Sequence, residues 1–547
     1  MKKSMLLKAI SVFAAVMLLL TLAACEKGGN NSADSSNTSG SESDEPAPSS
    51  QYFDESKVSD SAMPTDVKNA TMTTKEMLAK YRPHTDYRIQ QIRTTTNTIK
   101  PKNGGTAYYV SSIHGKTSNN GLSEKTPVAS LSDLNSFELK SGDVVYLERG
   151  SIFRESYKTT ADGVTYTAYG KGNKPLITNS PENGGSADRW SACTDAPNVY
   201  RFKGYLSADV GNISLDDRND KVAVKCFYAV RTGGSTYDKT TGKAFSGYKD
   251  LDNLHFWLDR GRNLYLRCDE GNPGKVFKSI EFGVYANVFT VANNNITVDN
   301  ICIKYGGRHG IGAGTNNGLT VQNCEFGWLG GSADAGYGDP DAVRLGNAVE
   351  IYGGATNYTV TNCYIYQCYD TGITFQYNVK ETDSPNLKME NIKFKDNVIE
   401  YCNYSIEWFF VDPQSLDTRY MKNISVDNNL MWYCGYGLCE QRPDKRTDCH
   451  IQGGYNYRSV YSQHGKGNIT ITNNLFAIGK RRLIRDGSVP FNETATYSNN
   501  TYIQTYNMYF GSSNEKGQSD RKFDENIRSY IESQLKDKKA TIIRIKD

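Results

Sequence analysis

Three acidic residues near the middle of the chain have the types and spacing that could support acid–base chemistry. Glu350 lies in "NAVEIYG", Asp370 directly precedes "TGITFQ", and Glu407 lies in "YSIEWFF". Each of these short apolar runs predicts a β-strand, in which successive side chains face opposite sides. Carboxylates held close together can act as general acid and base, or as acid and nucleophile, in cleaving a glycosidic bond. The strands that carry them must then be neighbours in the fold.

A repeated pattern indicates how such strands become neighbours. Six segments each have an alternating apolar strand, then Asn or Asp, then a second apolar strand: "NITVDNICI" from Asn295, "GLTVQNCEF" from Gly318, "NYTVTNCYI" from Asn357, "NIKFKDNVI" from Asn391, "NISVDNNLM" from Asn423 and "NITITNNLF" from Asn468. The copies begin at unequal intervals. Faithful strands with variable loops are typical of a solenoid, whereas a β-propeller would need four strands per blade and a regular period.

Aligning the repeats places one polar residue at the same corner of every coil. These residues are Asn300, Asn323, Asn362, Asp396, Asn428 and Asn473. Asn tolerates the left-handed backbone of a tight corner, and stacked side chains could bond to one another as a ladder. The pattern resembles the asparagine ladder of right-handed parallel β-helices such as pectate lyases.

Other segments carry the same resemblance, which covers residues 105–500. Residues 107–154 look like the opening of bacterial β-helix proteins that act on carbohydrates, and residues 187–281 look like their β-rich insertion. Residues 523–537 predict an amphipathic helix that caps the solenoid. The expected fold is therefore all-β: a right-handed parallel β-helix, with residues 51–104 packed on it and residues 501–547 as a C-terminal cap.

The resemblance also predicts which strands line a substrate groove. Their inward residues are expected to be Ile311, Val349, Ile373, Ile406, Leu438 and Leu483, and the residues that follow should face outward: Gly312, Glu350, Thr374, Glu407, Cys439 and, with a poor fit, Ile484. Glu350 and Glu407 then lie two coils apart, with Asp370 entering the strand between them. We expect these three to be catalytic.

Several residues near these strands are candidates for binding a substrate. Arg308 and His309 precede the first groove strand, Gln376 ends a later one, and Phe409 should face outward and could stack on a sugar ring. Arg442 lies in a long loop, "EQRPDKR", that could wall the groove. Asp334, Asp339 and Asp341 group oxygen ligands of the kind that calcium prefers, but their spacing matches no defined loop. We therefore expect no metal or other cofactor.

The N-terminus predicts export and a lipid anchor. Lys2, Lys3 and Lys8 accompany a long apolar run that ends in Leu22-Ala23-Ala24-Cys25. This arrangement has the charged and apolar regions of a signal peptide, and its end resembles the lipobox of bacterial lipoproteins. The resemblance implies that residues 1–24 are removed and that Cys25 is lipidated. Residues 25–50 are polar and predict a flexible tether outside the cytoplasmic membrane.

The whole-chain composition limits the remaining possibilities. The 547 residues carry a formal net charge of +3, which does not suggest nucleic acid as a partner. Of the 12 cysteines, 11 remain after lipidation of Cys25, an odd number that excludes a complete set of disulfides. Cys368, Cys402 and Cys434 each follow the ladder position by six residues and predict stacked core thiols.

Three functions are consistent with the sequence. The favoured one is a monomeric glycoside hydrolase that acts on a polysaccharide through the three carboxylates. The second is a polysaccharide lyase for a uronate-containing chain, for which basic residues at 442, 480, 481, 482 and 485 could neutralise the substrate. The third is a glycan-binding surface protein without catalysis.

Overall fold

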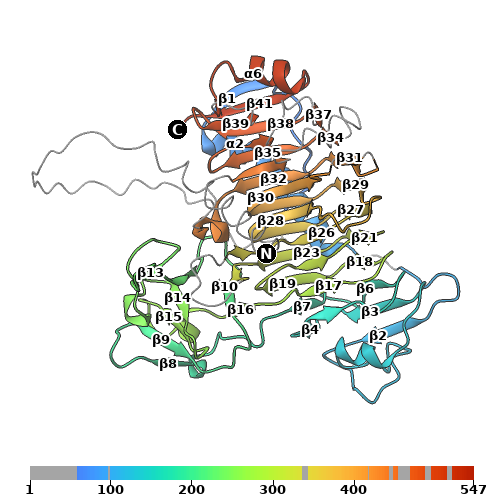
Figure 1. Cartoon of the computed structure of the whole chain (residues 1–547), viewed down its shortest axis with the longest axis vertical. Helices are drawn as coiled ribbons and strands as arrows, with labels where there is room; N and C mark the ends of the chain where they lie inside the picture. The colour runs from blue at the N-terminus through green and yellow to red at the C-terminus, as the bar shows by residue number, and fades with distance from the viewer. Residues whose placement is uncertain are drawn as a thin grey trace, which may run out of the picture. The chain divides into compact units, whose positions relative to one another are not determined.

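The computed structural model shows a parallel β-helix, as the repeat predicts. It describes residues 58–96, 99–334, 343–414, 416, 418–442, 448–453, 469–486, 495–513 and 520–547, all of which belong to one compact unit. Successive coils stack through parallel strand pairs (Figure 1). Among the described residues, no helix is long and apolar enough to cross a membrane.

Each full coil contributes strands to three sheets, which we call sheets 1, 2 and 3. Sheet 1 holds β17 (Phe289–Val291), β20 (Ile311–Ala313), β26 (Val349–Tyr352), the ends of β28 (Tyr364–Asn378) and β30 (Val398–Val411), β33 (Cys449–Gly453), β36 (Ile484–Asp486) and β39 (Tyr509–Ser513). Sheet 2 holds β19 (Cys302–Gly306), β23 (Glu325–Leu329), the starts of β28 and β30, β32 (Leu430–Cys434), β35 (Leu475–Gly479), β38 (Thr501–Thr505) and β41 (Thr541–Ile545).

Sheet 3 begins near the N-terminus and runs along the whole stack. Its strands are β2 (Ala107–Val110), β3 (Val144–Glu148), β6 (Thr165–Tyr169), β18 (Thr297–Asp299), β22 (Thr320–Gln322), β27 (Ala355–Thr361), β29 (Lys388–Lys395), β31 (Tyr420–Asp427), β34 (Ile469–Thr472) and β37 (Ala495–Ser498). The strands of the solenoid therefore extend beyond residue 500, because β38, β39 and β41 continue sheets 1 and 2. Helix α6 (Ile527–Tyr530) and a π-helical turn, Ile531–Leu535, lie between them at the end of the stack.

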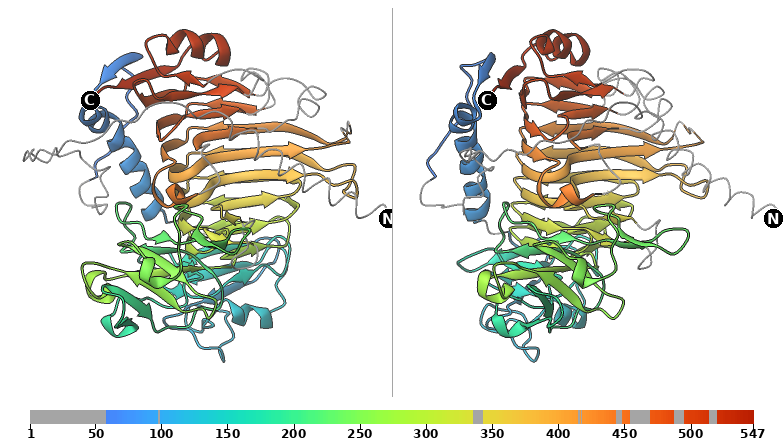
Figure 2. Two further views of the ribbon diagram at one scale, coloured as in Figure 1. Left: turned by 60° about the vertical axis from the view of Figure 1, so that its left-hand side comes forward. Right: turned by 90° about the vertical axis from the view of Figure 1, so that its left-hand side faces the viewer.

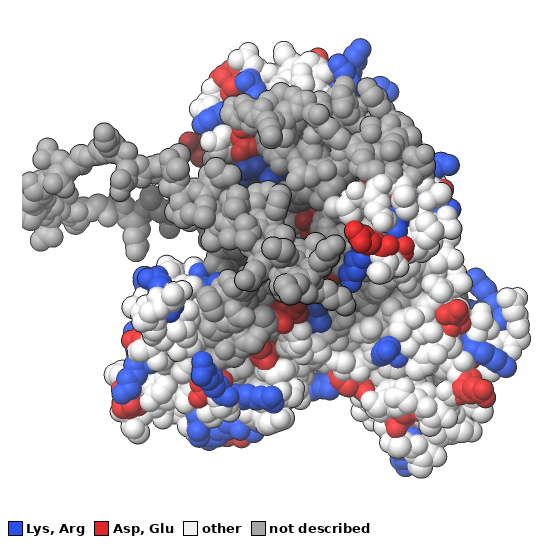
Figure 3. Space-filling view, viewed as in Figure 1, with Lys and Arg blue, Asp and Glu red and all other residues white. Residues whose placement is uncertain are grey.

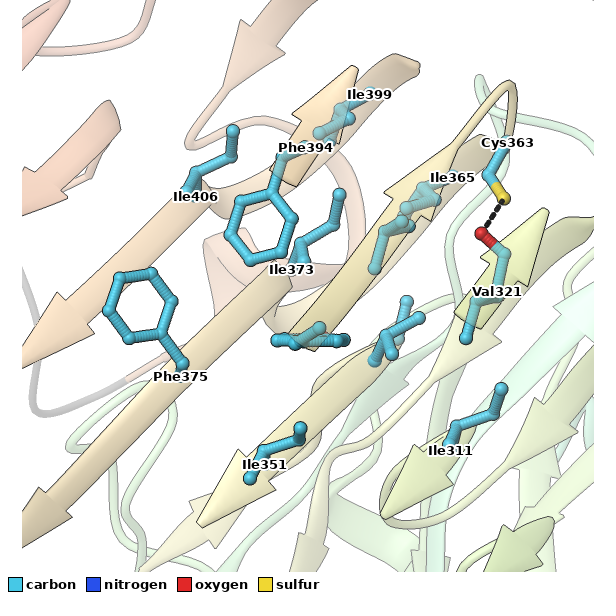
Figure 4. Close-up of a cluster of buried hydrophobic side chains, with 14 of the residues drawn as sticks. Ile311, Val321, Ile351, Cys363, Ile365, Ile373, Phe375, Phe394, Ile399 and Ile406 are labelled. Atoms are coloured by element: carbon cyan, nitrogen blue, oxygen red, sulfur yellow. Dashed lines mark hydrogen bonds between the residues drawn. The ribbon is translucent and has the colours of Figure 1, made fainter. Parts of the chain in front are cut away.

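The inward row of sheet 1 fills the space between the sheets. Ile311, Val349, Ile373 and Ile406 are in register and have no solvent exposure, as expected. Figure 4 shows Ile311, Ile373 and Ile406 among Phe375, Phe394 and other apolar side chains of the same core. This apolar interior gives the alternation that turns the intervening residues outward.

The prediction of the inward row is wrong at two positions, Leu438 and Leu483. Leu438 lies in a 3-10 turn, Gly437–Gln441, and the strand of that coil comes later, with Ile451 inward and Gln452 outward. Ile484, not Leu483, pairs with Ile451, so that Arg485 takes the outward position expected for Ile484. Cys439 is correspondingly not an outward groove residue.

The corner before sheet 2 carries two ladders rather than one. The expected residues do have left-handed backbone, as at Asn362 (φ 51°) and Asn428 (φ 54°), and some bond to a neighbour, as from Asn428 Nδ2 to Asp396 Oδ1 at 2.7 Å. The buried ladder, however, is formed by the next residue along the chain. Asn397, Asn429, Asn474 and Asn500 are joined amide to amide at 2.9–3.1 Å, and all are at most 1% exposed.

The cysteines of the described residues are thiols and most are buried. Eleven free cysteines are present, and Cys368 pairs in register with Cys402 on sheet 2. Burial, reinforced by Cys368, raises the pKa of the Cys402 thiol well above its ordinary value. These thiols therefore pack the core rather than act as nucleophiles.

Helix α2 (Thr74–Thr94) covers the outer face of sheet 2 (Figure 2). Thr73 and Glu76 form a capping box at its start, which satisfies free backbone N–H groups. Its apolar side chains pack against aromatic residues of sheet 2, and Trp432 Nε1 donates to Thr85 Oγ1 at 2.9 Å. Arg93 pairs with Glu325 at 3.0 Å, and the charged neighbours Arg93 and Lys304 hold the pKa of Glu325 far below its ordinary range despite burial.

The segment between the first coils and the main stack forms a separate small sheet. Its strands are β8 (Trp190–Ala192), β9 (Val199–Phe202), β11 (Val224–Lys225), β14 (His255–Leu258) and β15 (Leu264–Arg267). Strands β10 (Val210–Leu215) and β16 (Ile280–Val284) connect this inserted sheet to the solenoid. Positive and negative side chains are interspersed over its visible face (Figure 3).

Candidate functional site

Two of the three expected carboxylates lie in one outward row of sheet 1. Strand pairing places Gly312, Glu350, Thr374 and Glu407 side by side on successive coils. Neighbouring strands are about 4.8 Å apart, so the Cα atoms of Glu350 and Glu407 are separated by about 9–10 Å. Thr374 occupies the coil between them, and its small side chain leaves room for both carboxylates.

A continuous set of hydrogen bonds joins the two glutamates. The Asn347 side-chain amide donates to Glu350 Oε2, and Asn347 Oδ1 accepts from the Thr371 backbone N–H at 2.8 Å. The Thr371 hydroxyl in turn donates to Glu407 Oε2 at 3.0 Å. Both glutamate side chains thus reach toward the corner that precedes sheet 1. Asp370 lies at that corner, adjacent to Thr371.

Asp370 has a cationic partner that is remote in sequence. Arg442 Nη1 lies 2.5 Å from Asp370 Oδ1 and 3.3 Å from the Tyr369 carbonyl oxygen, to which it donates. The guanidinium also lies over the Tyr369 ring, with its carbon 5.1 Å from the ring centre. Because an adjacent guanidinium stabilises a charged carboxylate, this contact favours ionised Asp370.

The carboxylates are more buried than surface acids. Glu350, Asp370 and Glu407 are 7%, 8% and 6% exposed, although the sequence predicts open positions on a groove. The reason is that each side chain folds onto a polar neighbour instead of extending into solvent. Low exposure strengthens electrostatic interactions at such a site, which suits chemistry that develops charge.

His309 contacts Glu350 directly. Its Nδ1 lies 3.0 Å from Glu350 Oε2 and accepts from the Asn347 backbone N–H at 3.1 Å. Burial lowers the pKa of His309, against the opposing influence of Glu350. The imidazole is therefore neutral near pH 7, and its Nδ1 lone pair is used by the Asn347 N–H beside the carboxyl group.

Of the other residues predicted to bind substrate, Gln376 and Phe409 lie beside the row of carboxylates, whereas Arg308 pairs with another part of the chain. Gln376 and Phe409 are neighbours in the next outward row and are partly exposed, beside the exposed ring of Tyr352. Arg308 points elsewhere: it pairs with Asp334 at 3.3 Å and lies over the Tyr285 ring. It is thus placed as a structural contact of that loop.

Some predicted features lie outside the described residues. They include Asp339 and Asp341, Cys25 with the whole signal and tether region, and much of the loops expected to wall the groove. No group of metal-ligating side chains occurs among the residues that the structure describes. Asp334, the described member of the possible calcium cluster, accepts from Tyr285 instead, at 2.8 Å.

Sequence reasoning missed two residues that hold the site together. Asn347 lies three residues before Glu350, and Thr371 lies on the next coil, three residues before Thr374, which pairs with Glu407. A single polar residue three positions before an outward residue gives only a weak signal for such a role. It also missed Gln452, which continues the outward row beyond Glu407 and is followed there by Arg485.

The chain is similar in sequence to a protein named lacto-N-biosidase. It is 25% identical over 497 residues to lacto-N-biosidase from Bifidobacterium longum subsp. longum, an alignment that covers 75% of this chain. The chain spans only 29% of the length of that relative. No family model matches the chain.

The solved structures with which the chain aligns include two that are named as carbohydrate-active enzymes. A GH136 lacto-N-biosidase from Eubacterium ramulus aligns over 79% of this chain and 62% of that one, with 14% identity and a TM-score of 0.42. Pectate lyase Pel9A aligns over 77% of this chain and 76% of that one, with 14% identity and a TM-score of 0.36. The fold assignment itself rests on the strand register described above.

Proposed function

We propose that the protein is a glycoside hydrolase whose catalytic groups are Glu350, Asp370 and Glu407. The observation that carries the proposal is the hydrogen-bonded connection from Glu350 through Asn347 and Thr371 to Glu407. It holds two carboxylates in one row, with a third beside them. Glycoside hydrolysis requires a pair of carboxyl groups that flank the scissile bond. The sequence similarity to lacto-N-biosidase supports the same class of reaction.

Glu350 is the group we assign as general acid. The side chain beside it, the neutral His309 at 3.0 Å from Glu350 Oε2, brings no positive charge, whereas the Arg442 guanidinium lies beside Asp370. In this role Glu350 protonates the oxygen of the departing sugar as the glycosidic bond breaks.

The second role, base or nucleophile, requires an ionised carboxylate. Glu407 accepts a hydrogen bond from Thr371, and Asp370 is paired with Arg442; both contacts favour the charged form. Either group then activates a water molecule or attacks the anomeric carbon. The partner not used for that step stabilises positive charge that develops on the sugar ring.

The substrate proposed is a glycan chain that lies along the outward face of sheet 1. Phe409 and Tyr352 offer partly exposed rings at the rim of the row, and Gln376 offers an amide for a sugar hydroxyl. A lacto-N-bioside is the first substrate to test, because the relative is named for that activity. We also propose that the mature protein is anchored by lipid at Cys25, on the outer side of the membrane, and acts as a monomer.

A lyase is the second candidate, because Arg485 occupies the outward row two coils beyond Glu407. A glycan panel separates the two. A hydrolase releases reducing sugar without absorbance near 235 nm, whereas elimination yields an unsaturated product that absorbs there. Hydrolysis that is lost in Glu350→Gln and Glu407→Gln supports the proposal. Elimination that survives both changes and is lost in Arg485→Ala overturns it. Binding without cleavage would leave a glycan-binding protein.

A further inference from the structure

A cavity of about 450 Å³ lies at the corner that precedes sheet 1, beside the carboxylates but separate from the outward row. Its wall is built from two parts of the chain. Lys239, Thr240, Thr241 and Gly242 come from a loop of the insertion, and the remainder comes from the corners of the coils that follow Asp370. The size is within the range of small-ligand sites.

The lining of the cavity includes a buried amide nitrogen without a hydrogen-bond partner among the described residues. Asn403 is 2% exposed, and its Nδ2 makes no hydrogen bond within the part of the chain that the structure describes. Asn403 occupies the corner one coil beyond Asp370, since Thr371 pairs with Tyr404. Burying an N–H donor without a hydrogen bond costs free energy of folding. We therefore expect a ligand or water molecule to supply an acceptor for this amide.

The charges around the cavity are mainly positive. Two acids line it, and both already bond to the protein: Glu440 accepts from the Gly437 N–H at 2.9 Å and pairs with Lys480, and Asp448 accepts from the Arg481 N–H at 2.9 Å. Against these two acids stand four cations: Lys239, Arg442, Lys480 and Arg481. Because Arg442 is also paired with Asp370, the net excess is one positive charge, which favours an anionic ligand.

Arg442 connects this cavity to the proposed catalytic group. One guanidinium nitrogen pairs with Asp370, while the same side chain lines the cavity. A negative group bound there therefore shares the Arg442 side chain with Asp370.

We propose that this cavity is a subsite for a sugar that carries a carboxylate or a sulfate group. That the cavity belongs to a substrate site rests on the proposed function. Binding of a free acidic sugar to the cavity does not require cleavage. The guanidinium and ammonium groups recognise the anion, and the Asn403 amide and the Thr240 and Thr241 hydroxyls recognise oxygen atoms on the ring.

Binding of single sugars to the purified protein tests the subsite. The probes are glucuronate and glucose 6-sulfate, each compared with glucose, measured by calorimetry or ligand-observed NMR. We expect at least one acidic probe to bind about tenfold more tightly than glucose. Preference for one acidic probe identifies the anion. Equal affinity of glucose and both acidic sugars overturns the proposal.

Two variants locate the binding within the molecule. The double change Lys480→Gln with Arg481→Gln removes two cavity charges, and Lys393→Gln with Lys395→Gln is the matched control, since both lysines are exposed on β29. Only the cavity variant should lose the preference for the acidic sugar, by about tenfold. Equal losses in both variants would mean that net charge alone attracts the probe, which contradicts a site.

Asn403→Ala provides an independent check on the buried amide. It should weaken binding of the acidic sugar while circular dichroism and the melting temperature show a folded protein. If this variant unfolds, the cavity double variant still decides the question. If acidic sugars bind as proposed while no glycan is hydrolysed, the subsite stands and the proposed hydrolase function fails.

Discussion

Replacing Asn429 by Ala tests whether the buried ladder, rather than the partly exposed one, stabilises the solenoid. Asn429 Oδ1 accepts from Asn397 N and Nδ2 at 3.0 and 2.9 Å, and Asn429 Nδ2 donates to Phe394 O and Asn474 Oδ1, both at 3.0 Å. All four hydrogen bonds are lost in Asn429→Ala. At about 1 kcal/mol each, the free energy of unfolding falls by about 4 kcal/mol, and more where a buried group stays unpaired.

The adjacent Asn428 supplies the matched control. Asn428→Gly removes one hydrogen bond, to Asp396 at 2.7 Å, and glycine adopts the left-handed φ of 54° without strain. It should cost about 1 kcal/mol. Urea unfolding followed by circular dichroism measures both variants against the parent protein. The reasoning is refuted if Asn429→Ala is no less stable than Asn428→Gly.

Three further outcomes are expected. Burial lowers the pKa of His450 to about 3, so the unfolded chain binds this proton before the folded protein does as pH falls. The contribution of His450 to the free energy of unfolding is complete above pH 6.5 and should decline toward pH 3, by up to about 5 kcal/mol. In acid titrations of the melting temperature, His450→Gln should therefore lose less stability over this range. Thr371→Val keeps the shape but removes the hydroxyl that bonds Glu407, and should lower kcat about tenfold with little change in KM; an unchanged kcat would remove Thr371 from the site. Cys25→Ser should release the protein from the membrane pellet into the soluble fraction, and unchanged retention would exclude a lipid anchor.

Local sequence patterns predicted most of the fold because successive coils repeat the same pattern of apolar strands and polar corners. The alternation in "NAVEIYG" and "YSIEWFF" placed Val349 and Ile406 inward and Glu350 and Glu407 outward, as the strand register confirms. The pattern failed at residues 436–441. There Gly435 and Gly437 adopt positive φ, and the chain makes a turn before it re-enters sheet 1 at β33.

The contacts of the site were much less predictable than its strands. Arg442 meets Asp370 from a later coil, and the intervening residues contain no pattern that pairs them. The position of the buried ladder was also one residue away from the expected one, because the left-handed residue turns its own side chain outward and the next residue inward. Periodicity fixes which face a residue occupies, whereas partners across coils depend on loop lengths.

The low exposure of the carboxylates changes what their substitution should do. Glu350 and Glu407 each accept hydrogen bonds from neighbouring side chains, so conversion to Gln keeps one acceptor oxygen but introduces a donor into a crowded polar cluster. A cost of about 1–2 kcal/mol in stability is therefore expected, more than for open surface acids. Melting temperatures must accompany any rate measurement on these variants.

The rate of glycoside hydrolysis by Glu350→Gln, Asp370→Asn and Glu407→Gln, each compared with the parent protein, tests the central claim most directly. Amides preserve the shape of the side chains and remove their proton chemistry. At least two of the three folded variants should be slower by about 10²–10⁴, the usual contribution of a positioned acid or base. Hydrolysis at the parental rate by all three folded variants would contradict the assignment of the catalytic cluster.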